Sequence, residues 1–195
     1  ANITARPITV TAVTDTKVYN GTLSSSATPT ITSGSLATDD SATWTQAFSD
    51  KNAGTNKTLI PTGTVSDGNS GNNYNITFVN DTTGVINQKT LVVTATGIDK
   101  VYDGTITAAV TLSSDKLSDD TVDLAYTGAS FIDKNAGDGK AVSVTGISIS
   151  GTDAGNYNLT NTTAAATADI SPKTLTVTAA GINREYDGTT LATVS

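Results

Sequence analysis

KTLVVTATGIDKVYDGT, residues 89–105, decides the fold of this chain, because it recurs as KTLTVTAAGINREYDGT at residues 173–189. Twelve of the seventeen positions are identical. A looser copy, RPITVTAVTDTKVYNGT, occupies residues 6–22, and Tyr19, Tyr102 and Tyr186 follow one another at intervals of 83 and 84 residues. A period of this length is long for a solenoid unit and suits a small domain that folds on its own.

Other landmarks keep the same period. Phe48 recurs as Phe131, Tyr74 recurs as Tyr157, and the segment DKNAG stands at residues 50–54 and 133–137. The sequence therefore predicts one β repeat at residues 6–88, a second at 89–172 and the start of a third at 173–195. Because so short a segment is not stable alone in water, we expect the third copy to pack on the second or, as the alternative, on a neighbouring molecule. An alternative phase places the units at residues 22–105 and 106–195.

Within each copy the pattern is typical of β-strands. Aliphatic residues alternate with Thr at Ile8 and Val10, and again at Leu91 and Val93, which places the aliphatic side chains on one face. Proline cannot donate to a strand ladder, so Pro61 predicts an edge strand. The aliphatic alternation changes parity across Gly146, which a β-bulge would explain.

Composition favours an all-β protein with a thin core. The chain contains 39 Thr, 17 Gly and ten aromatic residues, and hydrophobic residues make up 36%. We expect each copy to be a small antiparallel β-sandwich, immunoglobulin-like, with a β-grasp module as the alternative. The linkers near residues 88–90 and 172–174 are short, so the tandem domains should form an elongated rod.

The repeated Tyr stands at the entrance of a tight turn. Gly21, Gly104 and Gly188 supply the positive φ that such a turn needs, and Asp103 or Asp187 can hydrogen-bond its own backbone. We expect each Tyr ring to be buried with its hydroxyl bonded to backbone. The alternative is that these rings form a platform on which a sugar stacks.

Catalysis, cofactor binding and metal binding all lack candidate residues. The chain has no Cys, His or Met and a single Glu, Glu185, so the usual nucleophile–base pairs and soft metal ligands are absent. The acids of residues 39–40, of residues 119–120 and Asp153 do not have the spacing of an EF-hand loop, and we expect them to be solvated turn acids, not calcium ligands. The sequence does not predict an enzyme.

The charge of the chain disfavours nucleic acid as a partner. The formal net charge is -7, and the 11 Lys and Arg are scattered singly. No apolar run is long enough to span a bilayer, and no signal peptide is recognisable. The expected partners are neighbouring repeats of the same chain, and we expect a monomer.

At these motifs the chain resembles the YDG-type repeats, related to the MBG repeats, of large bacterial adhesins of the filamentous haemagglutinin and two-partner-secretion type. The resemblance rests on the KTLTVTA strand, the YDGT turn, FIDKNAG at residues 131–137 and DAGNY at residues 153–157. It implies an extracellular stalk on a Gram-negative cell surface, which projects a distal region that binds host or matrix glycan or protein during attachment or biofilm formation. The alternative is that the repeats themselves bind glycan or matrix.

Overall fold

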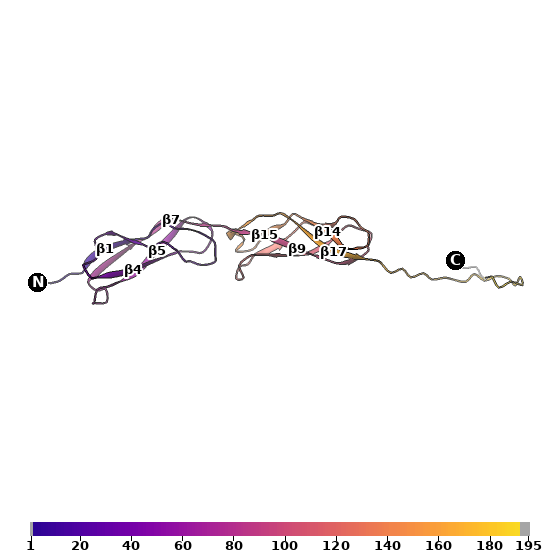
Figure 1. Ribbon diagram of the computed structural model, residues 1–195, viewed down its shortest axis with the longest axis horizontal. Coiled ribbons are helices and arrows are strands. Elements are labelled where there is room, and N and C mark those ends of the chain that lie inside the picture. The colour runs from indigo at the N-terminus through magenta and orange to yellow at the C-terminus, as the bar shows by residue number, and fades with distance from the viewer. Residues whose placement is uncertain (1, 192–195) are drawn as a thin grey trace.

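The computed structural model describes residues 2–191 and contains two elongated β bodies, one after the other along the long axis (Figure 1). Strands within residues 6–87 pair only with one another, and so do those within residues 89–171. The boundary therefore falls at Gln88. Under the alternative phase, the pairings of β2 (Thr16–Val18) with β7 (Asp81–Asn87) and of β10 (Lys100–Val101) with β17 (Thr163–Ser171) would cross a domain boundary.

The first repeat has two sheets. One has the order β3-β1-β6 and the other the order β2-β7-β5-β4. Besides β2 and β7, the strands are β1 (Arg6–Thr11), β3 (Thr30–Ser33), β4 (Ser41–Phe48), β5 (Gly54–Ser66) and β6 (Tyr74–Val79).

The second repeat repeats this plan in shorter pieces. Its largest sheet has the order β10-β17-β14-β13, and three two-stranded sheets pair β11 with β9, β12 with β15 and β16 with β8. The remaining elements are β8 (Lys89–Leu91), β9 (Val93–Ile98), β11 (Ala109–Ser114), β12 (Asp123–Ala125), β13 (Gly128–Phe131), β14 (Gly137–Thr145), β15 (Ser148–Ser150), the 3-10 turn η1 (Ala154–Asn156) and β16 (Tyr157–Leu159).

The all-β prediction is confirmed, but the pairing is mixed, not purely antiparallel. The long hairpin of β4 and β5 is antiparallel, as is the pairing of β14 with β17. The first strand of the repeat, by contrast, pairs in parallel with a late strand: β1 with β6 in the first repeat and β8 with β16 in the second. These paired strands are far apart in the chain, so no hairpin joins them and they can pair in parallel.

The edge-strand prediction for Pro61 is wrong for the strand as a whole. β5 lies between β7 and β4, and its first half, up to Leu59, pairs with β7. Pro61 itself falls in the second half, where it faces Gln46 of β4 and the β7 ladder has already ended. Its missing N–H therefore leaves no β7 partner unsatisfied.

The expected β-bulge at Gly146 is instead a break between two strands. β14 ends at Thr145, and β15 belongs to a different sheet, in which it pairs with β12. Gly146 has φ +66°, and a Cβ there would lie 2.0 Å from Oγ1 of Thr127. Glycine is therefore required at the point where the chain changes sheet.

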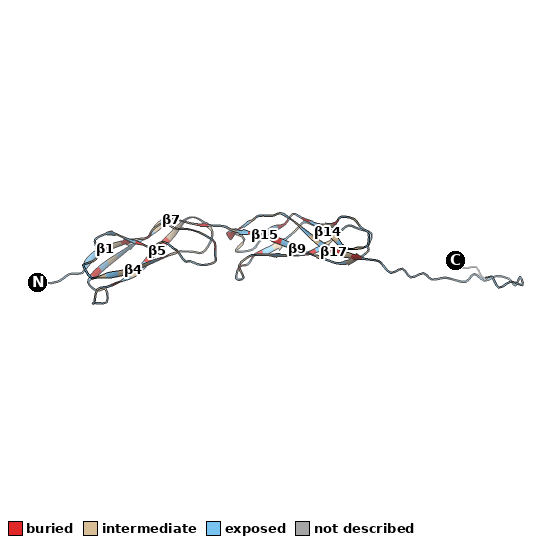
Figure 2. Cartoon of the chain, in the orientation of Figure 1, coloured by how far each residue is buried: buried red, intermediate tan, exposed pale blue. Residues whose placement is uncertain are grey.

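Buried residues alternate with exposed and intermediate ones along the strands of both repeats (Figure 2). Ile8, Val10, Leu91 and Val93 are all buried, as their alternation predicted. The larger core cluster contains residues of both repeats, including Tyr19 and Tyr157. The hydrophobic core thus continues across the boundary between the two domains.

The third copy does not pack on the second repeat as expected. Its described residues, 173–191, are exposed throughout, and Leu175 is 86% exposed whereas the equivalent Leu91 is fully buried. Figure 1 shows this segment extending beyond the second repeat. The strands that cover Leu91 in the second repeat have no counterpart among residues 173–191. No helix within residues 2–191 is long and apolar enough to cross a membrane.

Candidate functional site: the joint between the repeats

The YDGT turn is held by a basic side chain two residues before its Tyr. Lys17 Nζ donates to the carbonyl oxygens of Thr22 and Ser24 at 2.6 and 3.0 Å. Lys100 makes the same contacts with Thr105 and Thr107, both at 2.9 Å. Gly21 and Gly104 have φ +76° and +83°, so both turns have the left-handed geometry that was expected of them.

Asp103 is tied to the same turn. Its Oδ1 accepts hydrogen bonds from Lys100 Nζ and from the backbone N–H and hydroxyl of Thr105. The hydrogen bond from Lys100, together with those from Thr105, lowers the pKa of Asp103 to about 2. In the first copy the carboxamide oxygen of Asn20 accepts the equivalent bonds, so the turn forms with either residue.

The repeated Phe packs beside this turn. Nζ of Lys17 lies 5.1 Å from the ring centroid of Phe48, and Nζ of Lys100 lies 5.4 Å from that of Phe131. Both Phe rings are buried. The segment DKNAG follows the Phe after one residue, so the YDGT turn and this segment form one end of each repeat, which we call the distal end.

At the distal end of the first repeat, Tyr19 and Lys51 contact a carboxylate of the second repeat. Tyr19 Oη donates to Asp120 Oδ1 at 2.9 Å, and Lys51 Nζ lies 3.4 Å from the same oxygen. Tyr157 of the second repeat donates to Asp120 Oδ2 at 2.6 Å. The two Tyr rings meet edge to face, with centroids 5.7 Å apart. We call this group of four side chains the joint.

Backbone and amide groups of two repeated motifs extend the joint. The N–H of Ala53, in DKNAG of the first repeat, donates to Oδ1 of Asn156, in DAGNY of the second, at 2.9 Å. Asn156 Nδ2 lies 3.3 Å from Oδ1 of Asn52. The linker contributes as well, because Gln88 Nε2 donates to the carbonyl oxygen of Gly155 at 2.9 Å. The repeated motifs therefore meet one another across the boundary between the repeats.

The electrostatics of the joint favour a charged Asp120 and neutral Tyr hydroxyls. Burial raises the pKa of Asp120, but hydrogen bonds from Tyr157, Tyr19 and Lys51 outweigh it, so the pKa lies below its usual value. Burial and the hydrogen bond to Asp120 raise the pKa of Tyr157 to about 12 and also raise that of Tyr19. The donors to this buried carboxylate offset the desolvation cost that its burial carries.

The structure places the three repeated tyrosines in different environments. Tyr19 is only 2% exposed, so its ring is buried as expected, but its hydroxyl binds a side-chain carboxylate and not backbone. Tyr102, at the distal end of the second repeat, is half-buried, and Tyr186 is 96% exposed. A ring as enclosed as that of Tyr19 has no free face on which a sugar could stack.

The prediction that all the acids are solvated is wrong for Asp120, which is only 4% exposed. Asp119 is exposed, and Asp153 is half-buried beside Lys51, with 3.6 Å between Nζ and Oδ1. No group of three or more acidic side chains within residues 2–191 is arranged to hold a metal ion.

Sequence reasoning missed the roles of Lys17, Lys51, Asp120 and Asn156. A signal was present for most of them, since Lys17 recurs as Lys100 and Arg184, Lys51 as Lys134 and Asn156 as Asn73. These recurrences indicate that the residues matter in every copy. They do not indicate that the contacts are made between copies.

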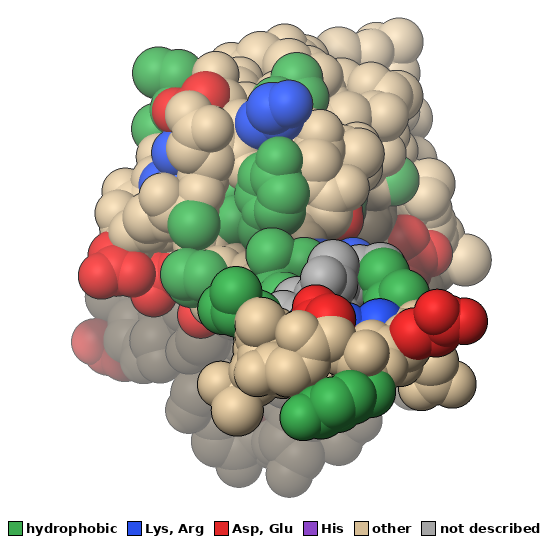
Figure 3. Space-filling view, turned by 90° about the vertical axis from the view of Figure 1, so that its right-hand side faces the viewer, with side chains coloured by type: hydrophobic (Ala, Val, Ile, Leu, Met, Phe, Trp, Pro, Cys, Tyr) green, Lys and Arg blue, Asp and Glu red, His purple; other side chains and the backbone are tan. Residues whose placement is uncertain are grey.

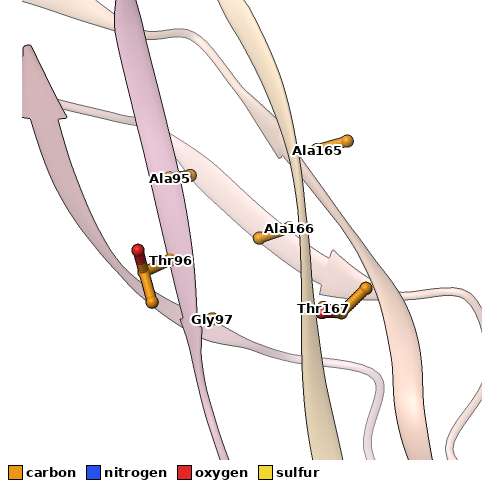
Figure 4. Close-up of a pocket in the computed structure, with 6 residues that line it drawn as sticks. All are labelled: Ala95, Thr96, Gly97, Ala165, Ala166 and Thr167. Atoms are coloured by element: carbon orange, nitrogen blue, oxygen red, sulfur yellow. The ribbon is translucent and has the colours of Figure 1, made fainter.

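A shallow cavity of about 350 Å³ lies between β9 and β17 of the second repeat (Figure 4). Its lining consists only of Ala, Thr and Gly residues, namely Ala95, Thr96, Gly97, Ala165, Ala166 and Thr167. It offers no charged or titratable group. The joint is therefore the better candidate for the functional feature of this chain.

A family model described as YDG domain matches the chain twice, over residues 4–84 and residues 87–165. The gap between the two matches, at residues 85–86, lies within a few residues of the boundary at Gln88 that the strand pairing defines. No curated protein and no solved structure matches the chain.

Proposed function

Since this chain belongs to the YDG domain family, with two matching domains, we propose that it is a structural spacer of a bacterial surface adhesin. In this role the repeats form an extracellular stalk that projects a distal binding region away from the cell. The role needs no catalytic group, and the acids that come together in the joint are already bound by Tyr and Lys. The observation that carries the proposal is the joint itself.

A spacer must resist bending between its domains, and the joint supplies that resistance. Its carboxylate is buried between two phenol groups, so bending the chain at Gln88 would exchange these hydrogen bonds for hydrogen bonds to water. A hydrogen bond to a charged group contributes a net free energy of about 1.5–3 kcal/mol, which bending would forfeit. The hydrophobic core that continues across the boundary also opposes bending, because bending would expose some of its apolar surface to water.

Small-angle X-ray scattering of the intact chain tests the spacer role. For the unaltered chain, the expected result is the scattering profile of a stiff rod. In Asp120→Ala the two repeats should also adopt bent arrangements, and these should change the maximum dimension of the particle. Asp119→Ala is the matched control, because this neighbouring acid is exposed and lies outside the joint. Two results for the unaltered chain would rule out the stiff spacer. One is a compact particle, and the other is a profile that indicates as much flexibility as that of Asp120→Ala.

A further inference from the structure

Asn20 precedes Gly21 in the turn of the first repeat, and the sequence contains no other Asn-Gly pair. Asn20 is exposed, and the other two copies of the turn have an acid at its position, Asp103 and Asp187. The backbone nitrogen that follows an Asn can attack the side-chain carbonyl carbon, Cγ, and close a five-membered imide ring. Gly hinders this attack least because it has no Cβ. Among the Asn residues of the chain, Asn20 is therefore the least hindered toward ring closure.

Three donors converge on the side-chain oxygen of Asn20. Its Oδ1 accepts hydrogen bonds from Lys17 Nζ at 3.1 Å, from the N–H of Thr22 at 3.1 Å and from the Thr22 hydroxyl at 2.9 Å. Attack on Cγ moves negative charge onto this oxygen, and donors that are already in place stabilise such a charge. The attacking group is accessible as well, because the N–H of Gly21 donates to no backbone acceptor within residues 2–191.

We propose that Asn20 is a site of spontaneous deamidation, at which the turn directs the product to aspartate. The Gly21 nitrogen forms a bond to Cγ of Asn20, and the bond from Cγ to the side-chain nitrogen breaks. The proton of the Gly21 N–H leaves with that nitrogen as ammonia, and one water then opens the imide ring. The net change is the loss of ammonia and the gain of water. The proposal is independent of the spacer role.

The hydrogen bonds of the turn select between two products. Water that attacks Cγ gives aspartate at position 20, whereas water that attacks the backbone carbonyl carbon gives isoaspartate, in which the main chain runs through the former side chain. The donors from Lys17 and Thr22 meet the oxygen on Cγ, so they activate the first route. The second repeat shows that aspartate fits this turn, because Asp103 Oδ1 accepts the same three hydrogen bonds from Lys100 and Thr105.

The same contacts stop the reaction at aspartate. An acid closes the imide ring only when its carboxyl group is protonated, since a carboxylate resists attack by a nucleophile. In the second repeat the hydrogen bond from Lys100, followed by those from Thr105, lowers the pKa of Asp103 to about 2, so this acid is ionised at neutral pH. Lys17 and Thr22 supply the equivalent donors in the first repeat. Deamidation thus completes there the YDGT sequence that the other copies carry.

Peptide mass spectrometry of the intact chain after incubation in a mildly alkaline buffer tests the proposal. Asn20 should deamidate at least about tenfold faster than Asn135, an exposed Asn that precedes Ala136 and is the matched control. Figure 3, which views the molecule from the end of the second repeat, shows a mostly neutral surface with separate charged side chains. The added negative charge should therefore delay elution from an anion-exchange column, with Asn20→Asp as the reference. A rate at Asn20 no greater than that at Asn135 would overturn the proposal.

The ratio of aspartate to isoaspartate isolates the contribution of the turn, and labelling by an isoaspartyl methyltransferase measures it. The ratio should be at least about tenfold higher in the folded chain than in the chain unfolded by urea. Thr22→Val removes one donor and should lower the ratio in the folded chain by about tenfold. Thr105→Val is the matched control, because it makes the same change in the turn of the second repeat.

Equal ratios in the folded and unfolded chain, or equal ratios in Thr22→Val and Thr105→Val, would show that the turn does not direct the reaction and would overturn the proposal. Either result would leave the scattering test of the spacer unaffected, since that test concerns the joint.

Discussion

At the scale of single residues, one carboxylate connects the two domains. Asp120 accepts hydrogen bonds from a Tyr of each repeat and faces Lys51, and no buried side-chain polar atom within residues 2–191 lacks a partner. The same Tyr recurs in all three copies, but among residues 2–191 only Tyr19 has a following repeat packed against it. Its burial is therefore a property of the joint and not of the repeat alone.

Removing one group of the joint should destabilise the protein. We expect Tyr19→Phe and Asp120→Asn each to lower the free energy of unfolding by about 1–3 kcal/mol, since the first removes a donor from a buried carboxylate and the second removes the charge that the Tyr hydroxyls and Lys51 bind. Tyr186→Phe is the matched control, because it makes the same change at a Tyr that is 96% exposed. It should change the free energy of unfolding by less than about 0.5 kcal/mol. Chemical denaturation measures all three, and equal losses for Tyr19→Phe and Tyr186→Phe would contradict the assignment.

The joint should weaken at both extremes of pH. The folded pKa of Asp120 is lowered from 3.8, so its stabilising contribution is present above about pH 4 and is lost as the pH falls through the lowered value. The pKa of Tyr157 is raised from 10.0 to about 12, so its contribution is present below pH 10 and is lost as the pH rises toward 12.

Ultraviolet titration of tyrosinate checks the alkaline side. The difference between the unaltered chain and Tyr157→Phe should show one Tyr that ionises near pH 12. Tyr19 and Lys51, which contact the same carboxylate, and Asp153, which lies beside Lys51, are retained in both proteins. A difference curve centred at pH 10 would mean that the Tyr157 hydroxyl is not held by Asp120.

At the scale of elements, much of the repeat was predictable. The alternation at Ile8 and Val10 identified a strand with one buried face, and the Gly of each YDGT turn has the expected positive φ. These features depend on neighbours in sequence, which a single copy of the pattern contains.

The sheet order and the joint were not predictable in this way. The parallel pairing of β1 with β6 joins residues far apart in the chain, and the contact of Tyr19 with Asp120 spans 101 residues and two repeats. A period shows which residues recur, but it cannot distinguish a contact within a copy from one between copies. Asp120 itself was singled out as an acid, yet only the tertiary structure reveals that it is buried.

The break between β14 and β15 gives a prediction at this scale. Gly146→Ala should lower the free energy of unfolding by about 2–4 kcal/mol, because φ is +66° and the new methyl group would overlap the Thr127 side chain. Gly139→Ala is the matched control, with φ +58° and no atom within 4 Å of the added Cβ, and should cost about 1 kcal/mol. Thermal denaturation that shows equal losses would exclude the steric effect.

At the scale of the whole molecule, two thin β domains are held together by the contact between them. Each repeat has a narrow core, and the larger core cluster takes residues from both. The linker is a single residue, Gln88, between β7 and β8, and its side chain is itself bonded to the second repeat. Short connection, shared core and buried carboxylate all favour a fixed angle between the domains.

Residual dipolar couplings measure that angle directly in solution. For the unaltered chain, we expect couplings from residues 6–87 and residues 89–171 to fit a single alignment tensor with the orientation of Figure 1. In Asp120→Ala the two sets should require separate tensors of different magnitude, while each repeat keeps its own fold. Separate tensors in the unaltered chain would contradict the central claim, because the repeats would then move independently despite the joint.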